Sequence, residues 1–173
     1  MSTWYLGIDP SASKMTDSSC IGWALFRENK LVEVGELTPD PPYFTRVRNW
    51  TRNKFKVVQA KDFQPQIIVG VETVYLGTNP NVFQGLVQCQ SHICAAVLDA
   101  GHLFRFINPL DSFKASTGLQ QYPLNKNGKR SGTRNPAIQA AVKQRYHLDG
   151  DATEHICDAI AIAEALIFKN EHQ

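Results

Sequence analysis

The sequence has no apolar run near the roughly 20 residues that a membrane-spanning helix needs. Its N-terminus also lacks the basic region and the long apolar stretch of a secretory signal, so we expect a protein that acts in the cytoplasm of its cell or of a phage-infected host. Internal repeats and composition breaks are absent as well. The chain is therefore predicted to form one domain over residues 1–173.

Cysteines are few and show no CxxC spacing, which disfavours a zinc site and leaves it only as an alternative. Three of them lie in apolar segments, where buried free thiols are common. We expect all four to be reduced, and they are Cys20, Cys89, Cys94 and Cys157.

Charge is distributed in blocks, although the net charge is only +2. Residues 46–61 contain six basic and no acidic residues, and residues 114–145 contain seven basic and no acidic residues. In residues 149–171, six acidic residues stand with a single lysine. Basic surfaces beside an acidic cluster are typical of a nuclease, which must hold a polyanion while its carboxylates hold metal. The alternative is two solvated helix faces and a basic loop.

The periodicity of apolar residues predicts an α/β fold with a five-stranded mixed sheet flanked by helices. The order is βββαβαβ followed by helices. The expected strands are 4–8, 20–26, 31–37, 67–72 and 103–107. The expected helices are 44–63, 81–100, 136–147 and a last one that ends near 168. Residues 119–135 are polar, basic and glycine-containing, which predicts a flexible inserted loop.

Four candidate metal ligands come from three distant segments. Asp9 and Glu72 each end a buried apolar strand, at the sheet edge where α/β proteins place chemistry. His155 and Asp158 are three residues apart near the start of the last helix, so they share one side of it. Simpler roles remain open: a turn aspartate before a proline for Asp9, a surface histidine for His155 and a salt bridge for Asp158. Glu72 is harder to explain without a counter-charge.

Two further acidic residues are left outside the site. Asp151 and Glu154 have the spacing of a helix capping box, and acidic residues near a helix N-terminus are favourable by themselves.

Three sequence blocks, in order, resemble the RuvC family of Holliday-junction resolvases. They are GIDPS at 7–11 with IGWA at 21–24, ETVY at 72–75 with Asn79, and HICDAIAIA at 155–163. The resemblance implies a ribonuclease H-like fold and a structure-selective DNA endonuclease that resolves four-way junctions into paired symmetric nicks. The first block alone is weak, since sugar kinases share it.

The resemblance also implies a cofactor, a partner and roles for particular residues. Asp9, Glu72, His155 and Asp158 would hold two Mg²⁺ ions, with Mn²⁺ also active because imidazole suits it better. Lys114 matches the first basic catalytic residue of the family. DNA contacts are expected from Tyr75, Asn79, Lys114, Lys129, Arg130 and Arg134, and the last three are candidates for the second basic catalytic residue.

Two departures mark a divergent member, of a kind that a phage could encode. The turn after Asp9 is longer than in bacterial members, and residues 119–135 are inserted where the basic catalytic residues belong. A homodimer is expected, because the helix at 81–100 is apolar on more than one face and a four-way junction is two-fold symmetric.

Four other functions compete with a junction resolvase. A broader branched-DNA nuclease or a catalytically silent branch-binding protein would use the same fold. A ribonuclease H or a transposase-like nuclease would use the same metals on other substrates. A sugar-kinase or actin-like ATPase needs two such domains, and 173 residues hold one.

Overall fold

The computed structural model describes residues 2–10, 20–74, 79–129, 132, 134–148, 150 and 152–172. The strands are β1 Thr3–Pro10, β2 Ile21–Arg27, β3 Lys30–Leu37, β4 Gln66–Glu72 and β5 Leu103–Ile107. The helices in these residues are α1 Tyr43–Lys61, α2 Pro80–Asp99, α3 Pro109–Thr117, α4 Arg134–Tyr146 and α5 Glu154–Glu171. The predicted order of strands and helices is confirmed.

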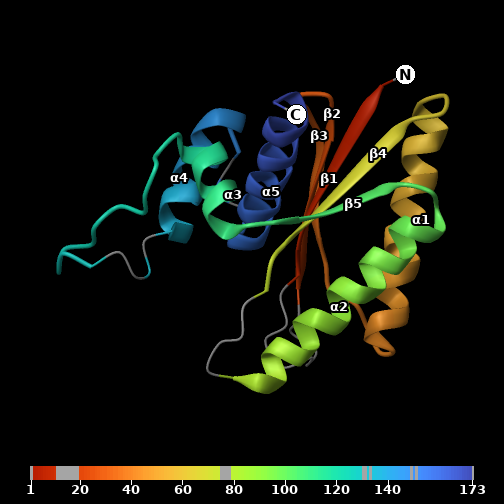
Figure 1. Ribbon diagram of the computed structural model, residues 1–173, viewed down its shortest axis with the longest axis horizontal. Coiled ribbons are helices and arrows are strands. Elements are labelled where there is room, and N and C mark those ends of the chain that lie inside the picture. The colour runs from red at the N-terminus through yellow and green to blue at the C-terminus, as the bar shows by residue number, and fades with distance from the viewer. Residues whose placement is uncertain are drawn as a thin grey trace.

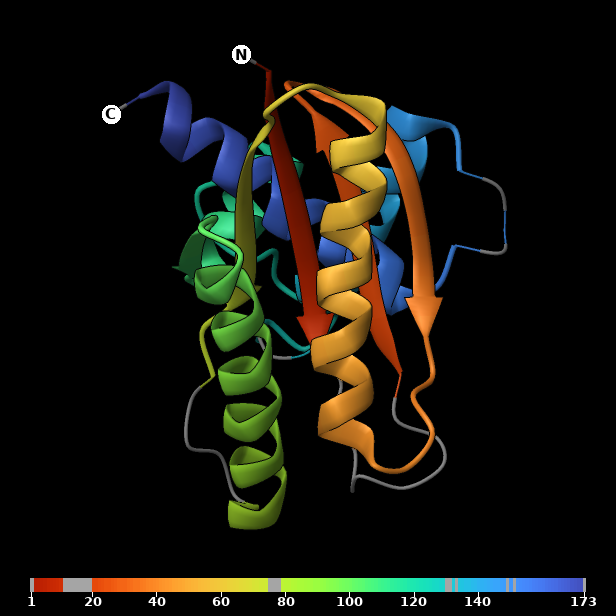
Figure 2. The same cartoon turned by 90° about the vertical axis from the view of Figure 1, so that its right-hand side faces the viewer.

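The five strands form one mixed sheet in the order β3-β2-β1-β4-β5. The first three strands pair antiparallel as a meander, and β4 and β5 join parallel to β1. Figure 1 shows the sheet nearly edge-on, with α1 and α2 on one side and α3, α4 and α5 on the other. Figure 2 looks onto the layer formed by α1 and α2.

Each strand sends alternate side chains into two separate cores. On β1, Trp4, Leu6 and Ile8 pack under α1 and α2, whereas Tyr5 packs under α5. The apolar helix α5 lies against the centre of the sheet and is buried along most of its length. This burial on both faces explains why the central strands are continuous apolar runs in the sequence.

The basic residues of α1 serve a different purpose from the one predicted. Arg48 and Arg52 both pair with Asp99 of α2, at 2.6 and 2.8 Å. Lys54 pairs with Glu33 of β3 at 3.1 Å and lies over the Trp23 ring. Most of this block therefore ties α1 to its neighbours in the fold, which favours the simpler alternative for these residues.

Two helix boundaries differ from the prediction. α1 ends at Lys61, before the extended residue Asp62, whose carboxylate accepts a hydrogen bond from Trp4 Nε1 at 3.0 Å. α4 begins at Arg134 and not at Pro136, because a proline within the first helical turn lacks only an N–H that would be unpaired anyway.

The start of α5 corrects the expected capping box. Thr153 is the N-cap, and its hydroxyl accepts a hydrogen bond from the Ile156 N–H at 3.3 Å. Glu154 is thus the first helical residue, and Asp151 lies outside the described residues.

All four cysteines are free, as predicted, and Cys89 and Cys157 are buried. Among the residues that the structure describes, no helix is long and apolar enough to cross a membrane.

Candidate active site

Asp9 and Glu72 lie side by side because they occupy equivalent positions on neighbouring parallel strands. Ile8 of β1 is in register with Val71 of β4, so the next residue of each strand points to the α5 side of the sheet. Both carboxylates line a cavity of about 260 Å³ at this edge. Its other lining residues are Pro10, Thr73, Val74, Leu86 and Pro109.

The N-terminal end of α5 is held directly against β1 and β2. Asp9 pairs with Gly22 across these strands, and a Cβ atom at Gly22 would lie 2.0 Å from the carbonyl oxygen of His155. His155 Nδ1 lies 2.8 Å from Asp9 Oδ2. This hydrogen bond raises the pKa of His155.

Asp158 is the most deeply buried of the predicted ligands, with 5% of its surface exposed. Its Oδ1 atom has no hydrogen-bond partner among the described residues. Burial, followed by the charge of Asp9, raises the Asp158 pKa to about 8. An acidic group in this condition needs a cation to be ionised at neutral pH.

Glu72 is held by contacts from three other elements. Ser112 Oγ on α3 donates to Glu72 Oε1 at 3.0 Å, and Gln90 Nε2 on α2 donates to the Glu72 carbonyl at 2.5 Å. Arg134 Nη2 donates to the same Oε1 atom. Burial raises the pKa of Glu72, while the Arg134 charge acts against that rise.

Arg134, predicted as a DNA contact and as one candidate for the second basic catalytic residue, lies beside two of the carboxylates. Besides its bond to Glu72, its Nη1 atom is 3.9 Å from Asp158 Oδ2 and its Nη2 atom is 3.2 Å from Ser112 Oγ. The guanidinium is therefore the positive charge that balances this part of the site.

These side chains fit a divalent cation in chemical type. Three carboxylates with hard oxygen atoms come from three elements, and the unpartnered Asp158 Oδ1 atom is a free ligand. Among the described residues, however, no three His, Cys, Asp or Glu side chains already converge into a ligand cluster. The carboxylates must therefore turn toward one another to share an ion.

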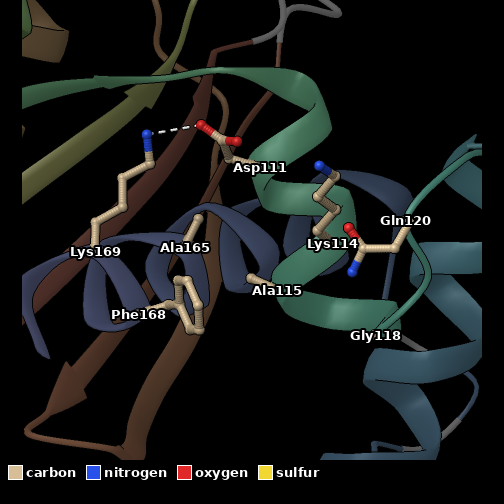
Figure 3. A pocket seen from close by; sticks show the side chains of 8 residues that line it. All are labelled: Asp111, Lys114, Ala115, Gly118, Gln120, Ala165, Phe168 and Lys169. Carbon is tan, nitrogen blue, oxygen red and sulfur yellow. Dashed lines mark ion pairs between the residues drawn. The ribbon is translucent and has the colours of Figure 1, made fainter. Parts of the chain in front are cut away.

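Lys114 lines a different cavity from the one that Asp9 and Glu72 line. Ser112 faces Glu72, and a residue two positions later is rotated by about 200° around the helix. Lys114 instead lines a second cavity of about 520 Å³ between α3 and α5, beside Phe168 and the ion pair of Lys169 with Asp111 (Figure 3). Its predicted catalytic role has no geometric support, because the helix turns it away from the carboxylates.

The structure describes only some of the remaining residues that were predicted to contact DNA. Tyr75 and Arg130 lie outside the described residues. Asn79 is the N-cap of α2, where its side chain accepts hydrogen bonds from the N–H groups of the first turn. Lys129 is exposed on a turn in which its N–H donates to Asn125 Oδ1 at 3.0 Å.

Two supporting residues were missed at the sequence level. Ser112 orients Glu72, and Glu36 of β3 accepts a hydrogen bond from the Thr153 hydroxyl beneath the start of α5. The Asn108-Pro109 start of α3 signals a helix in the sequence, but nothing there signals that Ser112 faces Glu72.

No protein-family profile and no curated protein sequence matches this chain. Solved structures do resemble it. A Thermus thermophilus RuvC in complex with a Holliday junction substrate superimposes with a TM-score of 0.69 at 14% identity, covering 97% of this chain and 96% of that one. A second Thermus thermophilus RuvC structure gives 0.67 at 15% identity, covering 98% and 96%. The chain therefore has the ribonuclease H-like fold of RuvC, as predicted.

Proposed function

We propose that this protein is a metal-dependent endonuclease that resolves four-way DNA junctions. The observation that carries the proposal is the placement of Asp9 and Glu72 in one cavity at the edge of the sheet, with Asp158 joined to this site through Arg134, in a fold shared with a RuvC bound to a Holliday junction. The charge of Asp9 raises the pKa of both Glu72 and Asp158, and the charge of Glu72 also raises the pKa of Asp158. Such a cluster is unfavourable unless cations bind it.

The residues proposed to hold two Mg²⁺ ions are Asp9, Glu72, His155 and Asp158. When bound, the ions would supply an activated water and stabilise the charge that develops on the phosphate. His155 must be neutral to act as a ligand or to accept a proton from water, so it has to give up the proton that Asp9 now favours.

The basic catalytic role, expected of Lys114 from the sequence, is assigned to Arg134 in this proposal. A guanidinium presents paired N–H donors that match two phosphate oxygens. Arg134 bonds to Glu72 and lies 3.9 Å from Asp158, so a small movement of its side chain would bring it to a phosphate bound beside the proposed ligands. Lys129 and Arg130, which precede α4 in the sequence, are proposed to contact the DNA backbone.

Cleavage of labelled substrates tests the function directly. We expect paired, symmetric nicks in a four-way junction with Mg²⁺ or Mn²⁺, and little cutting of flap, duplex or RNA:DNA hybrid. Asp9→Asn should reduce the rate by about a thousandfold, because a lost ligand removes several kcal/mol of transition-state stabilisation. Asp40→Asn, at an exposed carboxylate outside the site, is the matched control and should cleave normally.

Other outcomes of this assay select other functions. Equal cutting of flaps would indicate a broader branched-DNA nuclease. Cutting only of hybrids would indicate a ribonuclease H. Tight junction binding with no cleavage in either metal would contradict the nuclease and favour a silent binding protein, in which Arg134 permanently replaces the cation.

Paired nicks require two active sites, and we place the dimer contact on α2 and the neighbouring edge strand β5. Leu98 and Phe106 are 61% and 56% exposed there, and with Val87 they line an apolar hollow of about 350 Å³. Large exposed apolar side chains gathered in one place are typical of interaction sites. A second copy of the chain is the occupant that suits a two-fold symmetric substrate.

A charge at the centre of this surface should separate the two copies. Leu98→Lys is expected to lower the mass measured by light scattering from that of a dimer to that of a monomer, because a lysine would be buried unpaired at the interface. Phe63→Lys changes an apolar residue that is exposed elsewhere, after α1, and should leave the mass unchanged. A monomeric wild type at micromolar concentration would contradict this contact.

A further inference from the structure

Arg134 contacts two carboxyl groups that a bound cation would need as ligands. Its guanidinium donates to Glu72 Oε1 and lies 3.9 Å from Asp158 Oδ2, so one oxygen atom of each of these two proposed ligands faces the arginine. A guanidinium and a divalent cation repel each other strongly at such distances in a partly buried site. Binding of the ion and the present position of Arg134 therefore exclude each other.

The backbone that carries Arg134 is firmly anchored, so only its side chain is free to change position. At the far end of α4, Arg145 and Tyr146 both bind the buried Glu164 carboxylate of α5, and Arg145 Nη2 also donates to the Ser116 carbonyl at 2.7 Å. Ile138 and Val142, in the middle of α4, are fully buried. The helix is thus packed along its length and can hold Arg134 at the site in either side-chain position.

A DNA phosphate is the group best able to draw Arg134 away from the carboxylates. The Arg134 side chain is 18% exposed and stands at the first residue of α4, where backbone N–H groups favour an anion. Bidentate arginine–phosphate pairing is strong and directional. A phosphate placed at this helix start would compete for the guanidinium with Glu72 and would leave both carboxylates free.

We propose that Arg134 is a substrate-released block of the metal site. In the free protein its guanidinium holds Glu72 and stands beside Asp158, so divalent cations bind weakly. When DNA is bound, Arg134 pairs with a backbone phosphate, and the carboxylates turn toward each other to take up the ions. This inference rests on the proposed nuclease function and adds that metal loading is coupled to substrate, which would protect other nucleic acids from cleavage.

Mn²⁺ binding measured without cleavage tests the block. By titration calorimetry or by the electron paramagnetic resonance of free Mn²⁺, the DNA-free Arg134→Gln variant should bind Mn²⁺ about tenfold or more tightly than the wild type, within the usual range of such couplings. Arg46→Gln is the control, since Arg46 is an exposed arginine of α1 on the other side of the sheet, and its affinity should match the wild type. Equal or weaker binding by a folded Arg134→Gln protein would overturn the proposal.

A second measurement tests the coupling to DNA on the wild type, and it does not depend on the folding of Arg134→Gln. With a saturating four-way junction in Ca²⁺-free buffer, kept at a temperature where cleavage is slow, the wild type should gain about tenfold in Mn²⁺ affinity. Mn²⁺ bound by the DNA alone is subtracted with the Asp158→Asn protein. An unchanged wild-type affinity would overturn the inference.

The two hypotheses can fail separately. Junction cleavage by a wild type whose Mn²⁺ affinity is insensitive to DNA and to Arg134→Gln would refute the block and leave the nuclease standing. Tighter Mn²⁺ binding by Arg134→Gln, together with no cleavage of any substrate, would support the block and refute the nuclease. Arg134→Lys, which keeps one charge but loses the paired donors, should lie between the wild type and Arg134→Gln in Mn²⁺ affinity.

Discussion

Gly22→Ala is expected to prevent stable folding, because the added methyl group has no space. Its Cβ atom would lie 2.0 Å from the carbonyl oxygen of His155 and 2.2 Å from the carbonyl carbon. These are backbone atoms of α5, so no side-chain rotation relieves the contact. Either α5 lifts off the sheet or the chain remains unfolded, and we expect a loss of about 3 kcal/mol or more in the free energy of unfolding.

Chemical denaturation of a glycine series measures this effect. Gly7→Ala should be as severe, since its Cβ atom would lie 2.1 Å from the Ala159 carbonyl oxygen. Gly70→Ala should be milder, because its nearest contact is the Leu166 side chain, whose Cδ1 atom lies at 2.6 Å and can rotate away. Gly150→Ala, with no atom within 4 Å, is the control. A Gly22→Ala protein with the midpoint of the control would show that α5 does not approach β2 this closely.

The same close approach is what builds the site, so stability and function share one cause. Gly22 lies opposite Asp9 in the sheet and beneath His155, and only a residue without a side chain lets these two come within 2.8 Å. A variant that folds with α5 displaced should lose the hydrogen bond between His155 and Asp9. It would then lose activity even where a helical far-ultraviolet spectrum is retained.

The fold was predictable because its signals are local. Apolar runs, alternation and helix ends each involve neighbouring residues, and they were sufficient for five strands in the correct order. Asp9 and Glu72 were found for a similar reason, since each ends a buried strand and equivalent ends of parallel strands meet.

The basic residues were predicted less well, because their partners are distant in sequence. Arg134 and Glu72 are 62 residues apart, and no pattern in the chain shows that they meet. Lys114 was placed by resemblance alone, and in the structure it lines the cavity between α3 and α5. The arginines of α1 form a block in sequence, but Asp99, which pairs with Arg48 and Arg52, comes from another helix.

Asp158→Asn is expected to make the metal-free protein more stable while abolishing its activity. Burial raises the Asp158 pKa to about 8, above its value of about 4 in the unfolded chain. The folded protein therefore retains a proton that the unfolded chain has lost, and the free energy of unfolding of the wild type falls as pH rises from about 4 to about 8. Asparagine resembles the protonated acid and does not incur this loss.

Thermal melts in a chelating buffer at two pH values should reveal the difference. At pH 4 the two proteins should melt together, and at pH 8.5 the variant should be more stable by a few kcal/mol. Its cleavage rate should be about a thousandfold lower, since a proposed ligand is missing. Asp40→Asn, at an exposed carboxylate, should show neither change.

Mg²⁺ at concentrations high enough to displace Arg134 from the carboxylates should reverse the order of stability, because a cation at the site binds the folded protein only. The wild type should gain stability at pH 8.5 as Mg²⁺ favours the ionised Asp158, and the variant should gain much less. Variant and wild type that respond equally to Mg²⁺ would mean that Asp158 is not a ligand. If the metal-free variant and the metal-free wild type show the same pH dependence of stability, Asp158 is already ionised in the folded wild type. Arg134, 3.9 Å away, would then be a sufficient partner for it.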